Sequence, residues 1–344
     1  MKYCKFNARM KVSETRATVL CIIIMHYIIE TRCQTNSIFC TAFSPKPAKR
    51  FWTRIHGINE WRDNVFSDID IAPGKELRKP ICILPFGSEE SLLQGQTKEL
   101  QLYEDRFLKL FDKVMNEHES VVAMGLMSEE DQGLYHAVPI CEVIDYNNMG
   151  GELGIFLTIR CVGRAELLDI RQDDPYLILD CIEIVDEGSP KTNISNVVAD
   201  DIENMVKALH DIEERLSERL EDQAKEGTLP ESISVYQSSD DFYDGDDDGP
   251  NRLQRYSEAV QKALDSDAQG YFSPIADDET QENRSTQELT AISWAAFSTE
   301  STNELDDFYR VQALATRDLL DRLKLGLLLL NEKFKLVENV LKMS

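Results

Sequence analysis

The sequence has no excess of basic residues. Its 344 residues include 62 Asp and Glu against 37 Lys and Arg, and the formal net charge at pH 7 is −25. Proteins that bind nucleic acids or anionic membranes by general electrostatic attraction need basic surface. The charge balance therefore argues against both classes, while leaving room for a local basic patch.

Several motifs that carry catalytic chemistry are missing as well. The sequence has no G-x-x-x-x-G-K-[ST] phosphate-binding loop, no G-x-S-x-G nucleophile motif and no H-E-x-x-H zinc motif. Its five histidines are dispersed along the chain. No pattern places a nucleophile beside a base, so we predict no catalytic residue, no metal ligand and no cofactor.

The spacing of the eight cysteines excludes the usual zinc motif, because no C-x-x-C occurs. Four of them lie near the N-terminus, at positions 4, 21, 33 and 40. The other four, Cys82, Cys141, Cys161 and Cys181, stand inside apolar runs. We expect these four to be buried thiols that act as small hydrophobic residues, with a metal or redox role as the alternative.

One acidic stretch resembles the start of a calcium-binding loop. Asp244, Asp246, Asp248 and Gly249 match positions one, three, five and six of an EF-hand. Position twelve, which should supply a bidentate glutamate, is Arg255. Because the loop lacks its strongest ligand, we do not expect calcium binding.

The N-terminal 57 residues have the composition of a targeting segment. Five basic residues precede the apolar run Val19–Ile29, which is too short to span a bilayer and is typical of a signal peptide. Residues 31–59 then contain no acid, and the stretch around Phe43 resembles the cleavage motif of diatoms and related algae. We expect residues 1–57 to be a signal peptide followed by a plastid transit peptide, in an alga with a secondary plastid. A secreted or signal-anchored protein is the alternative.

The next part of the chain is rich in strand patterns. Residues 58–79 read as a loose lead-in, and residues 80–186 contain seven short apolar or alternating runs separated by Gly, Asn and Asp clusters. The one clear helical pattern among them is Asp105–Glu117. This combination predicts a small, mostly antiparallel, barrel-like sheet.

The remaining chain is predicted to be helical around an acidic insertion. Residues 187–228 hold an amphipathic helix that packs on the body of the protein or, alternatively, on a coiled-coil partner. Residues 229–289 form an acidic, partly disordered insertion with a short helix over Asn251–Asp265.

Residues 290–344 are predicted to form the C-terminal helices. The last helix runs from Arg317 to about Met343, with Thr316 as its N-cap. Gly326 inside this helix is expected to permit a close approach of another helix, or else to weaken that turn.

The order of several motifs resembles the N-terminal substrate-binding domain of Lon proteases. The matching residues are Leu84-Pro85-Phe86, Gln94-Gly95-Gln96, Leu100, Leu102, Tyr103-Glu104, Arg106-Phe107, residues 136–143, Gly163-Arg164, Pro175-Tyr176-Leu177, Gln312-Ala313-Leu314 and Asp321-Arg322-Leu323. The chain departs from the family at Gln94 and Asp105, where proline is usual, and at Ala315, where the family has glutamate.

The resemblance implies an α+β fold in which a PUA-like, mostly antiparallel β-barrel is followed by an α-helical bundle. It implies eight signature residues, which we expect to be structural: Pro85, Gly95, Gln96, Glu104, Arg106, Gly163, Arg164 and Arg322. It does not indicate which residues bind substrate. The ATPase and serine–lysine protease modules of a full Lon protease do not follow, so a stand-alone domain is expected.

The function that the resemblance implies is non-catalytic binding of unfolded or specific proteins and peptides. An adaptor in plastid protein quality control, acting with a plastid protease, would fit this role. No nucleic acid partner is expected, and no membrane association is expected for the mature form. The alternatives are a PUA-like protein that binds RNA or a small ligand, and a substrate receptor in a larger complex.

Overall fold

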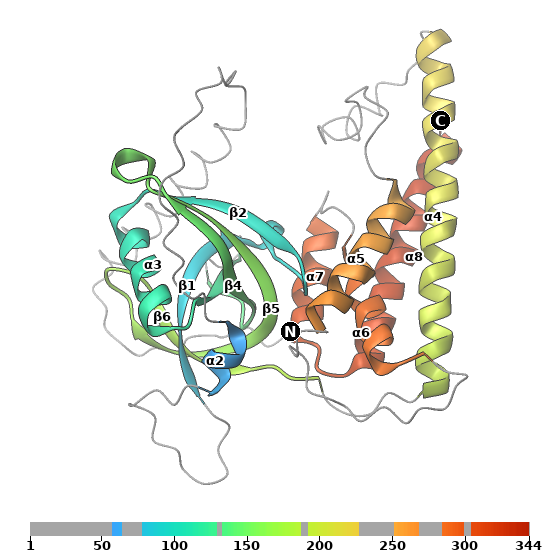
Figure 1. Ribbon diagram of the computed structural model, residues 1–344. Helices are drawn as coiled ribbons and strands as arrows, with labels where there is room; N and C mark the ends of the chain where they lie inside the picture. Colours follow the sequence, from blue (N-terminus) through green and yellow to red (C-terminus); the bar gives the residue numbers. More distant parts are fainter. Residues whose placement is uncertain are drawn as a thin grey trace.

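The structure is a computed structural model that describes residues 57–63, 78–128, 133–186, 192–226, 251–267, 284–298 and 304–343. A strand-rich half lies beside a helical half (Figure 1). The strands are β1 (Lys79–Gly87), β2 (Thr97–Leu102), β3 (Val121–Met127), β4 (Ala137–Asn148), β5 (Ile155–Gln172) and β6 (Ile178–Glu183). The helices are α2 (Ile58–Asp63), α3 (Asp105–Glu117), α4 (Thr192–Glu226), α5 (Arg252–Asp267), α6 (Thr286–Ala295), α7 (Glu304–Ala315) and α8 (Leu319–Met343). The short 3₁₀ turns are η1 (Ser88–Glu90) and η2 (Gly151–Leu153).

The six strands form one mixed sheet in the order β2-β5-β4-β3-β1-β6, and β5 also pairs with β6. The pairings β5–β4–β3–β1–β6–β5 therefore form a closed ring. β2 pairs with the first part of β5, and β6 pairs with its last part. β1 and β3 run parallel, and the other pairs are antiparallel. This arrangement is α+β and mostly antiparallel, as expected.

The sequence patterns explain which strand faces are buried. β1 and β3 are apolar runs buried on both faces, whereas β2 alternates exposed and less exposed side chains. Phe107, Leu110, Phe111 and Val114 form the buried stripe of α3, which begins and ends at the residues predicted.

The strand predictions need one correction within the ring. The runs at residues 151–163 and 164–170 are predicted as two separate elements, but from Ile155 onward they belong to the single strand β5. β5 reaches 18 residues because irregularities in its pairing with β4 and β6 let it bend around the ring. Gly163 lies inside the strand and does not form a turn.

The predicted lead-in is also partly wrong, because it contains the helix α2. Ile58 and Trp61, three positions apart, are both buried against the sheet. The Lys79 Nζ donates to the Trp61 carbonyl oxygen over 2.8 Å and lies 4.9 Å from the centroid of the Trp61 ring. The lysine ties the end of α2 to the start of β1.

In the helical half, α4 packs along α8, and α5, α6 and α7 lie between this pair and the sheet (Figure 1). One side of α4 is buried, at Ile202, Leu209, Ile212 and Leu216. The helix therefore packs on the body of the protein, which is the first of the two predicted arrangements. The short predicted helix corresponds to α5, shifted by one or two residues at its ends.

The predicted N-cap of the last helix is wrong. α8 begins at Leu319, and the carboxylate of Asp318 accepts a hydrogen bond from the Asp321 N–H over 3.0 Å. The hydroxyl of Thr316 donates instead to the carbonyl oxygen of Gln312, at the end of α7. Thr316 therefore ends one helix, and Asp318 begins the next.

The predicted close helix approach at Gly326 is confirmed. A Cβ placed on Gly326 would lie 2.6 Å from the Cβ of Ala296, directly after α6. Such a distance is shorter than van der Waals contact permits, so the crossing of α8 and the α6 end depends on glycine.

Residues 1–56 of the predicted targeting segment 1–57, and the acidic stretch around Asp244, lie outside the described residues. Within the described ranges, no helix has both the length and the apolar character needed to cross a bilayer.

Candidate functional site

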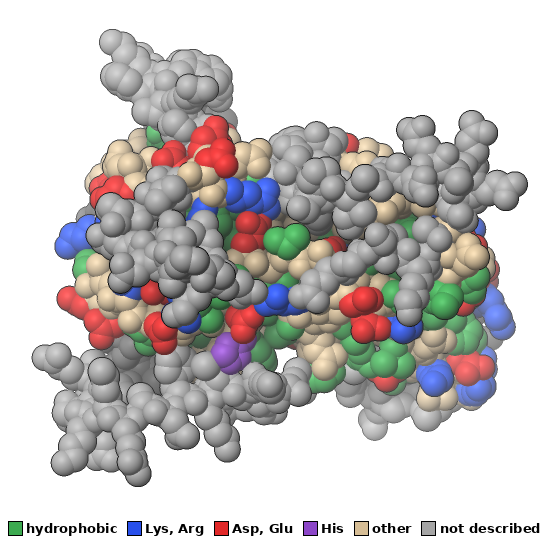
Figure 2. Space-filling view, turned by 90° about the horizontal axis from the view of Figure 1, so that it is seen from below, with side chains coloured by type: hydrophobic (Ala, Val, Ile, Leu, Met, Phe, Trp, Pro, Cys, Tyr) green, Lys and Arg blue, Asp and Glu red, His purple; other side chains and the backbone are tan. Residues whose placement is uncertain are grey.

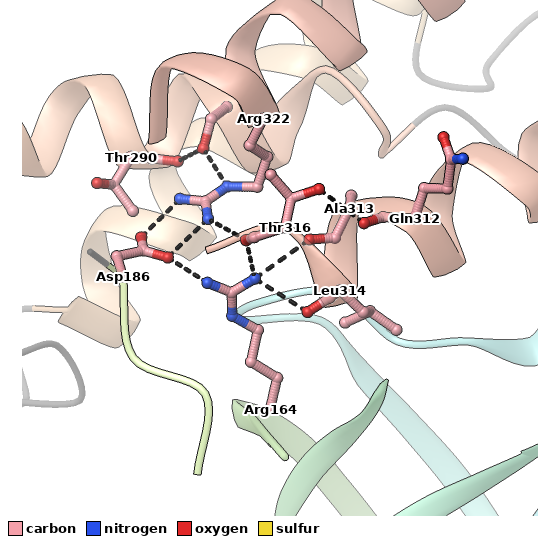
Figure 3. A network of polar contacts seen from close by, with 9 residues as sticks. Arg164, Asp186, Thr290, Gln312, Ala313, Leu314, Thr316 and Arg322 are labelled. Atoms are coloured by element: carbon pink, nitrogen blue, oxygen red, sulfur yellow. Dashed lines mark hydrogen bonds and ion pairs between the residues drawn. The ribbon is translucent and has the colours of Figure 1, made fainter. Parts of the chain in front are cut away.

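Arg164 and Arg322 meet at the boundary between the sheet and the helices (Figure 3). Arg322 donates from both terminal nitrogens to the carboxylate of Asp186, each over 2.7 Å, and from Nε to the hydroxyl of Ser293 over 2.9 Å. Arg164 donates to the same carboxylate and to the carbonyl oxygens at the end of α7, among them that of Leu314 over 3.0 Å. These contacts connect β5, α6, α7 and α8.

The environment of this network is buried and partly aromatic. The ring of Trp294 lies 4.2 Å from the guanidinium carbon of Arg322 and 5.2 Å from that of Arg164. Burial opposes ionisation of Asp186, but the charge and hydrogen bonds of Arg322, with the charge of Arg164, outweigh it and lower the pKa of that carboxyl. The two arginines are committed to structural contacts, so this boundary is a poor candidate for a ligand site.

A second contact between the halves is the turn at residues 94–96. Gly95 has φ +80°, and a Cβ there would lie 2.5 Å from the carbonyl oxygen of Lys262 in α5. The Gln96 side-chain oxygen accepts from the Leu93 N–H over 2.9 Å and from Arg310 of α7 over 3.1 Å. Two signature residues thus fasten β2 to the helices.

The other signature residues lie inside the strand-rich half. Arg106 donates to the carboxylate of Glu104 over 2.7 Å and stacks 4.5 Å from the ring of Phe107, which fixes the passage from β2 into α3. Pro85 is paired with Gly125 of β3, and Gly163 is paired with Ile140 of β4. A Cβ on Gly163 would make only ordinary contacts, so its backbone position does not require glycine.

The described part of the chain contains no group of three or more His, Cys, Asp and Glu that could hold a metal ion. Cys82, Cys141, Cys161 and Cys181 are free and buried, as the sequence predicted. On the face seen from below, acidic and basic side chains are interspersed over the described surface (Figure 2). That pattern gives no support to an RNA-binding face there.

A different surface gathers exposed apolar side chains. The large side chains of Tyr103, Met149, Leu153 and Phe156 are all more than 40% exposed. They lie at the end of β2 and around the connection between β4 and β5. Exposed hydrophobic residues are ordinary when isolated, whereas a group of them indicates an interaction surface.

Backbone pairing and hydrogen bonds show that these residues are neighbours. Phe156 is paired with Gln101 of β2, and the Gln101 amide donates to the Leu153 carbonyl oxygen over 3.0 Å. The Met149 N–H donates to the carbonyl oxygen of Gly154 over 3.0 Å, and a Cβ on Gly154 would lie 2.9 Å from the Tyr103 Cα. The four side chains therefore surround one strand connection.

Outward-facing residues of three strands continue this surface. Glu99 of β2, Thr158 of β5 and Asp145 of β4 form one cross-strand row, and Gln101, Phe156 and Asn147 form the next. We call these six residues, with Tyr103, Met149 and Leu153, the outer face. Glu99 and Asp145 are both exposed, so the outer face combines apolar groups with negative charge.

The outer face was not predicted from the sequence. The alternation of β2 already placed Glu99 and Gln101 on one side, and continuing it by two residues would have added Tyr103. Phe156 could not be assigned in this way, because it stands between two other apolar residues, Ile155 and Leu157.

No family model matches the sequence. No curated protein matches it either. Among solved structures, the chain is similar to the N-terminal domain of a Mycobacterium avium complex Lon protease, with 13% sequence identity and a TM-score of 0.40, over 74% of this chain and 98% of that one. It is also similar to a Lon N-terminal domain protein from Xanthomonas campestris, with 12% identity and a TM-score of 0.38, over 72% of this chain and 95% of that one.

Proposed function

We propose that this chain is a non-catalytic module that binds other proteins or peptides through the outer face. The observation that carries the proposal is the group formed by Tyr103, Met149, Leu153 and Phe156 at the end of β2 and around the connection between β4 and β5. The Lon-like order of sequence motifs supports the same function.

The physical argument starts from the area that a partner would cover. An aromatic side chain buries about 150–250 Å² when it is fully covered, and burial of apolar area contributes about 25 cal/mol per Å². Tyr103 and Phe156 are close to half exposed, so each retains area that a partner can remove from water. Unfolded chains expose apolar side chains that complement such a surface, whereas folded proteins bury most of theirs.

A comparison of folded and unfolded forms of one protein tests the proposal. The probe is lysozyme that has been reduced and carboxamidomethylated so that it cannot refold, with folded lysozyme as the comparator of similar positive charge. Binding would be followed by fluorescence anisotropy at 150 mM salt. We expect the unfolded probe to bind at least tenfold more tightly. Equal affinity for both forms, or affinity for neither, would contradict the proposal.

Paired variants then locate the surface. The double substitution Tyr103→Ser and Phe156→Ser should weaken binding of the unfolded probe at least tenfold. The control is Val197→Ser with Leu328→Ser, which changes two other exposed apolar residues, in α4 and α8. If the control weakens binding as much as the first pair, the outer face is not the binding surface.

We propose further that the module acts as an adaptor in plastid protein quality control. The basic, apolar and then acid-free order of residues 1–57 supports this location. A fusion of residues 1–57 to a fluorescent protein should enter the plastid of a diatom, and Phe43→Ala should leave it outside. Secretion of the unsubstituted fusion would exclude the plastid location without affecting the binding proposal.

A further inference from the structure

The free edge of β2 adds a specific mode of binding to the proposed function, on which this inference rests. β2 is the last strand in the sheet order and pairs with β5 alone among the described strands. No backbone hydrogen bond from Thr97–Leu102 to a described residue outside β5 is present. An unpaired strand edge is a template for another extended chain.

The contacts of Cys161 show which β2 groups face outward. The Cys161 N–H donates to the carbonyl oxygen of Gln96, and its own carbonyl oxygen accepts from the Gly95 N–H. Cys161 and Gln96 therefore occupy a hydrogen-bonded position of the β5–β2 ladder. In an antiparallel pair these positions recur every second residue. Lys98, Leu100 and Leu102 then bond to β5, while the backbone groups of Thr97, Glu99 and Gln101 point to the free edge.

The same residues that present free backbone groups also present exposed side chains. Thr97, Glu99, Gln101 and then Tyr103 are all exposed. An added strand would place its own outward side chains beside these, because directly opposed residues lie about 5 Å apart. The edge thus offers a carboxylate at Glu99 and an amide at Gln101, and Tyr103 adds an aromatic ring directly after the strand.

We propose that β2 binds an extended, unfolded segment as an added antiparallel strand, and that the segment carries an aromatic residue four positions before a basic one. The basic residue is opposite Glu99, near Asp145 in the same cross-strand row. The aromatic residue is opposite Tyr103. Antiparallel addition is chosen because it is the more stable pairing per residue, and it sets the order of the two residues.

The negative charge around Glu99 favours a segment with a basic residue at this position over a segment with an acidic one. Glu99 and Asp145 stand on either side of Thr158, and the whole chain carries a net charge of −25. A like charge opposite Glu99 would be destabilising, whereas Lys or Arg there forms a favourable cross-strand pair. Lys98 does not offset the acids, because its Nζ is 2.9 Å from Glu90.

The test uses the full-length protein and the acetylated, amidated peptide STYTVTRTS, in which the tyrosine stands four positions before the arginine. Binding is measured by calorimetry, and amide exchange by NMR. On binding, exchange of the Glu99 and Gln101 amides should slow at least tenfold. The Lys98 and Leu100 amides, already bonded to β5, should change little.

Two methylated peptides examine the backbone contact directly. N-methylation of the valine and arginine removes the donors that would face β2, and should abolish binding. N-methylation of the two threonines that flank the valine blocks the opposite edge, and should leave binding intact. Equal effects of the two modifications, or unslowed exchange at Glu99 and Gln101 in a bound complex, would overturn strand addition.

A charge exchange tests the position opposite Glu99. Glu99→Lys should weaken binding of the peptide at least about fivefold, and replacing the peptide arginine with glutamate should restore binding to this variant. Glu214→Lys makes the same charge change on the exposed side of α4 and should have no effect. Loss of binding without restoration by the glutamate peptide would refute the pairing.

The outcomes also separate this inference from the proposed function. If unfolded lysozyme binds but the peptide does not, the protein binds polypeptides by another mode and strand addition is wrong. If neither probe binds, the proposed function and this inference both fail. If the reversed peptide, STRTVTYTS, binds better than the original, the antiparallel orientation is wrong.

Discussion

Arg322 donates two hydrogen bonds of 2.7 Å to the carboxylate of Asp186, and the Arg322 side chain is completely buried. The pair connects the end of the strand-rich half to the last helix. Arg164 donates to the same carboxylate from β5 (Figure 3). The single negative charge of Asp186 is therefore shared by two buried guanidinium groups.

Removal of this charge should be strongly destabilising. In Asp186→Asn, the guanidinium groups of Arg164 and Arg322 would remain buried beside each other without a counter-charge. Loss of one partner from a buried ion pair costs about 3–5 kcal/mol. We expect the free energy of unfolding, measured by urea denaturation at pH 7, to fall by about this amount.

The matched control is Glu166→Gln, which removes the 3.0 Å ion pair between Glu166 and Arg317. Both side chains are substantially exposed there, so the cost should be under about 1 kcal/mol. Similar losses of unfolding free energy for the two substitutions would mean that Asp186 does not stabilise the buried arginines as its geometry indicates.

The sequence indicated two members of this network but not their common partner. Arg164 and Arg322 were recognised through a family pattern, which records residue type and order along the chain. Asp186 directly follows Ile184 and Val185 and resembles an ordinary acidic residue at the end of a strand run. Its role is set by Arg164 of β5 and Arg322 of α8, which both reach its carboxylate. Contacts between distant segments depend on tertiary packing, and local periodicity does not report it.

Local patterns predicted elements more reliably than their connections. The helix Asp105–Glu117 was predicted to the residue because its apolar spacing is strict. β5 was predicted as two runs, residues 151–163 and 164–170, whereas the ring of strands keeps it extended. The outer face was missed because it combines residues of β2, β4 and β5, and which strands are neighbours is a property of the sheet order.

Gly326 offers a test of helix packing through a double-mutant cycle. Gly326→Ala should gain up to about 1 kcal/mol of helix propensity, but its Cβ would meet that of Ala296 at 2.6 Å. Overpacking costs about 1–3 kcal/mol, so a net loss of stability is expected. The additional change Ala296→Gly removes the opposing methyl group and should recover the loss.

The cycle is measured by urea denaturation of the two single variants, the double variant and the parent. A favourable coupling energy of about 1 kcal/mol or more is expected for residues in direct contact. Additive effects of the two substitutions would show that the close approach of α8 to the end of α6 is not what requires glycine.

His118 should make stability depend on pH below neutrality. It is buried at the end of α3, and burial, together with the positive charge of Lys113, lowers its pKa from 6.5 to about 4. Between these values the unfolded chain binds a proton that the folded protein excludes. The contribution of neutral His118 to the free energy of unfolding is therefore fully present above pH 6.5 and is lost as the pH falls toward 4.

The contribution of His118 can be isolated with His118→Gln, which cannot titrate. Between pH 7.5 and 5.0 the parent should lose roughly 2 kcal/mol more unfolding free energy than the variant. The comparison subtracts the carboxyl groups, which titrate in both proteins. Parallel pH profiles would mean that His118 accepts a proton in the folded state.

The buried thiols should be unreactive in the folded protein. Burial raises the pKa of Cys82 to about 12, and it also raises the pKa values of Cys141 and Cys181. Since the thiolate is the nucleophile, iodoacetamide at pH 8 should leave the four peptides containing Cys82, Cys141, Cys161 and Cys181 unmodified. In 8 M urea all four should be alkylated, as mass spectrometry of the digested protein would show.

Cys141 and Cys161 test this prediction most strictly, because they are close enough to form a disulfide. The two residues are directly opposed on β4 and β5. The backbone groups of Cys161 bond toward β2, so its pairing with Cys141 is non-hydrogen-bonded, the position at which opposed side chains lie closest. If the buried-thiol interpretation holds, these neighbours stay reduced in air because both are buried and burial raises the pKa of Cys141. A disulfide between them in the purified, folded protein would contradict it and would indicate a redox role for the pair.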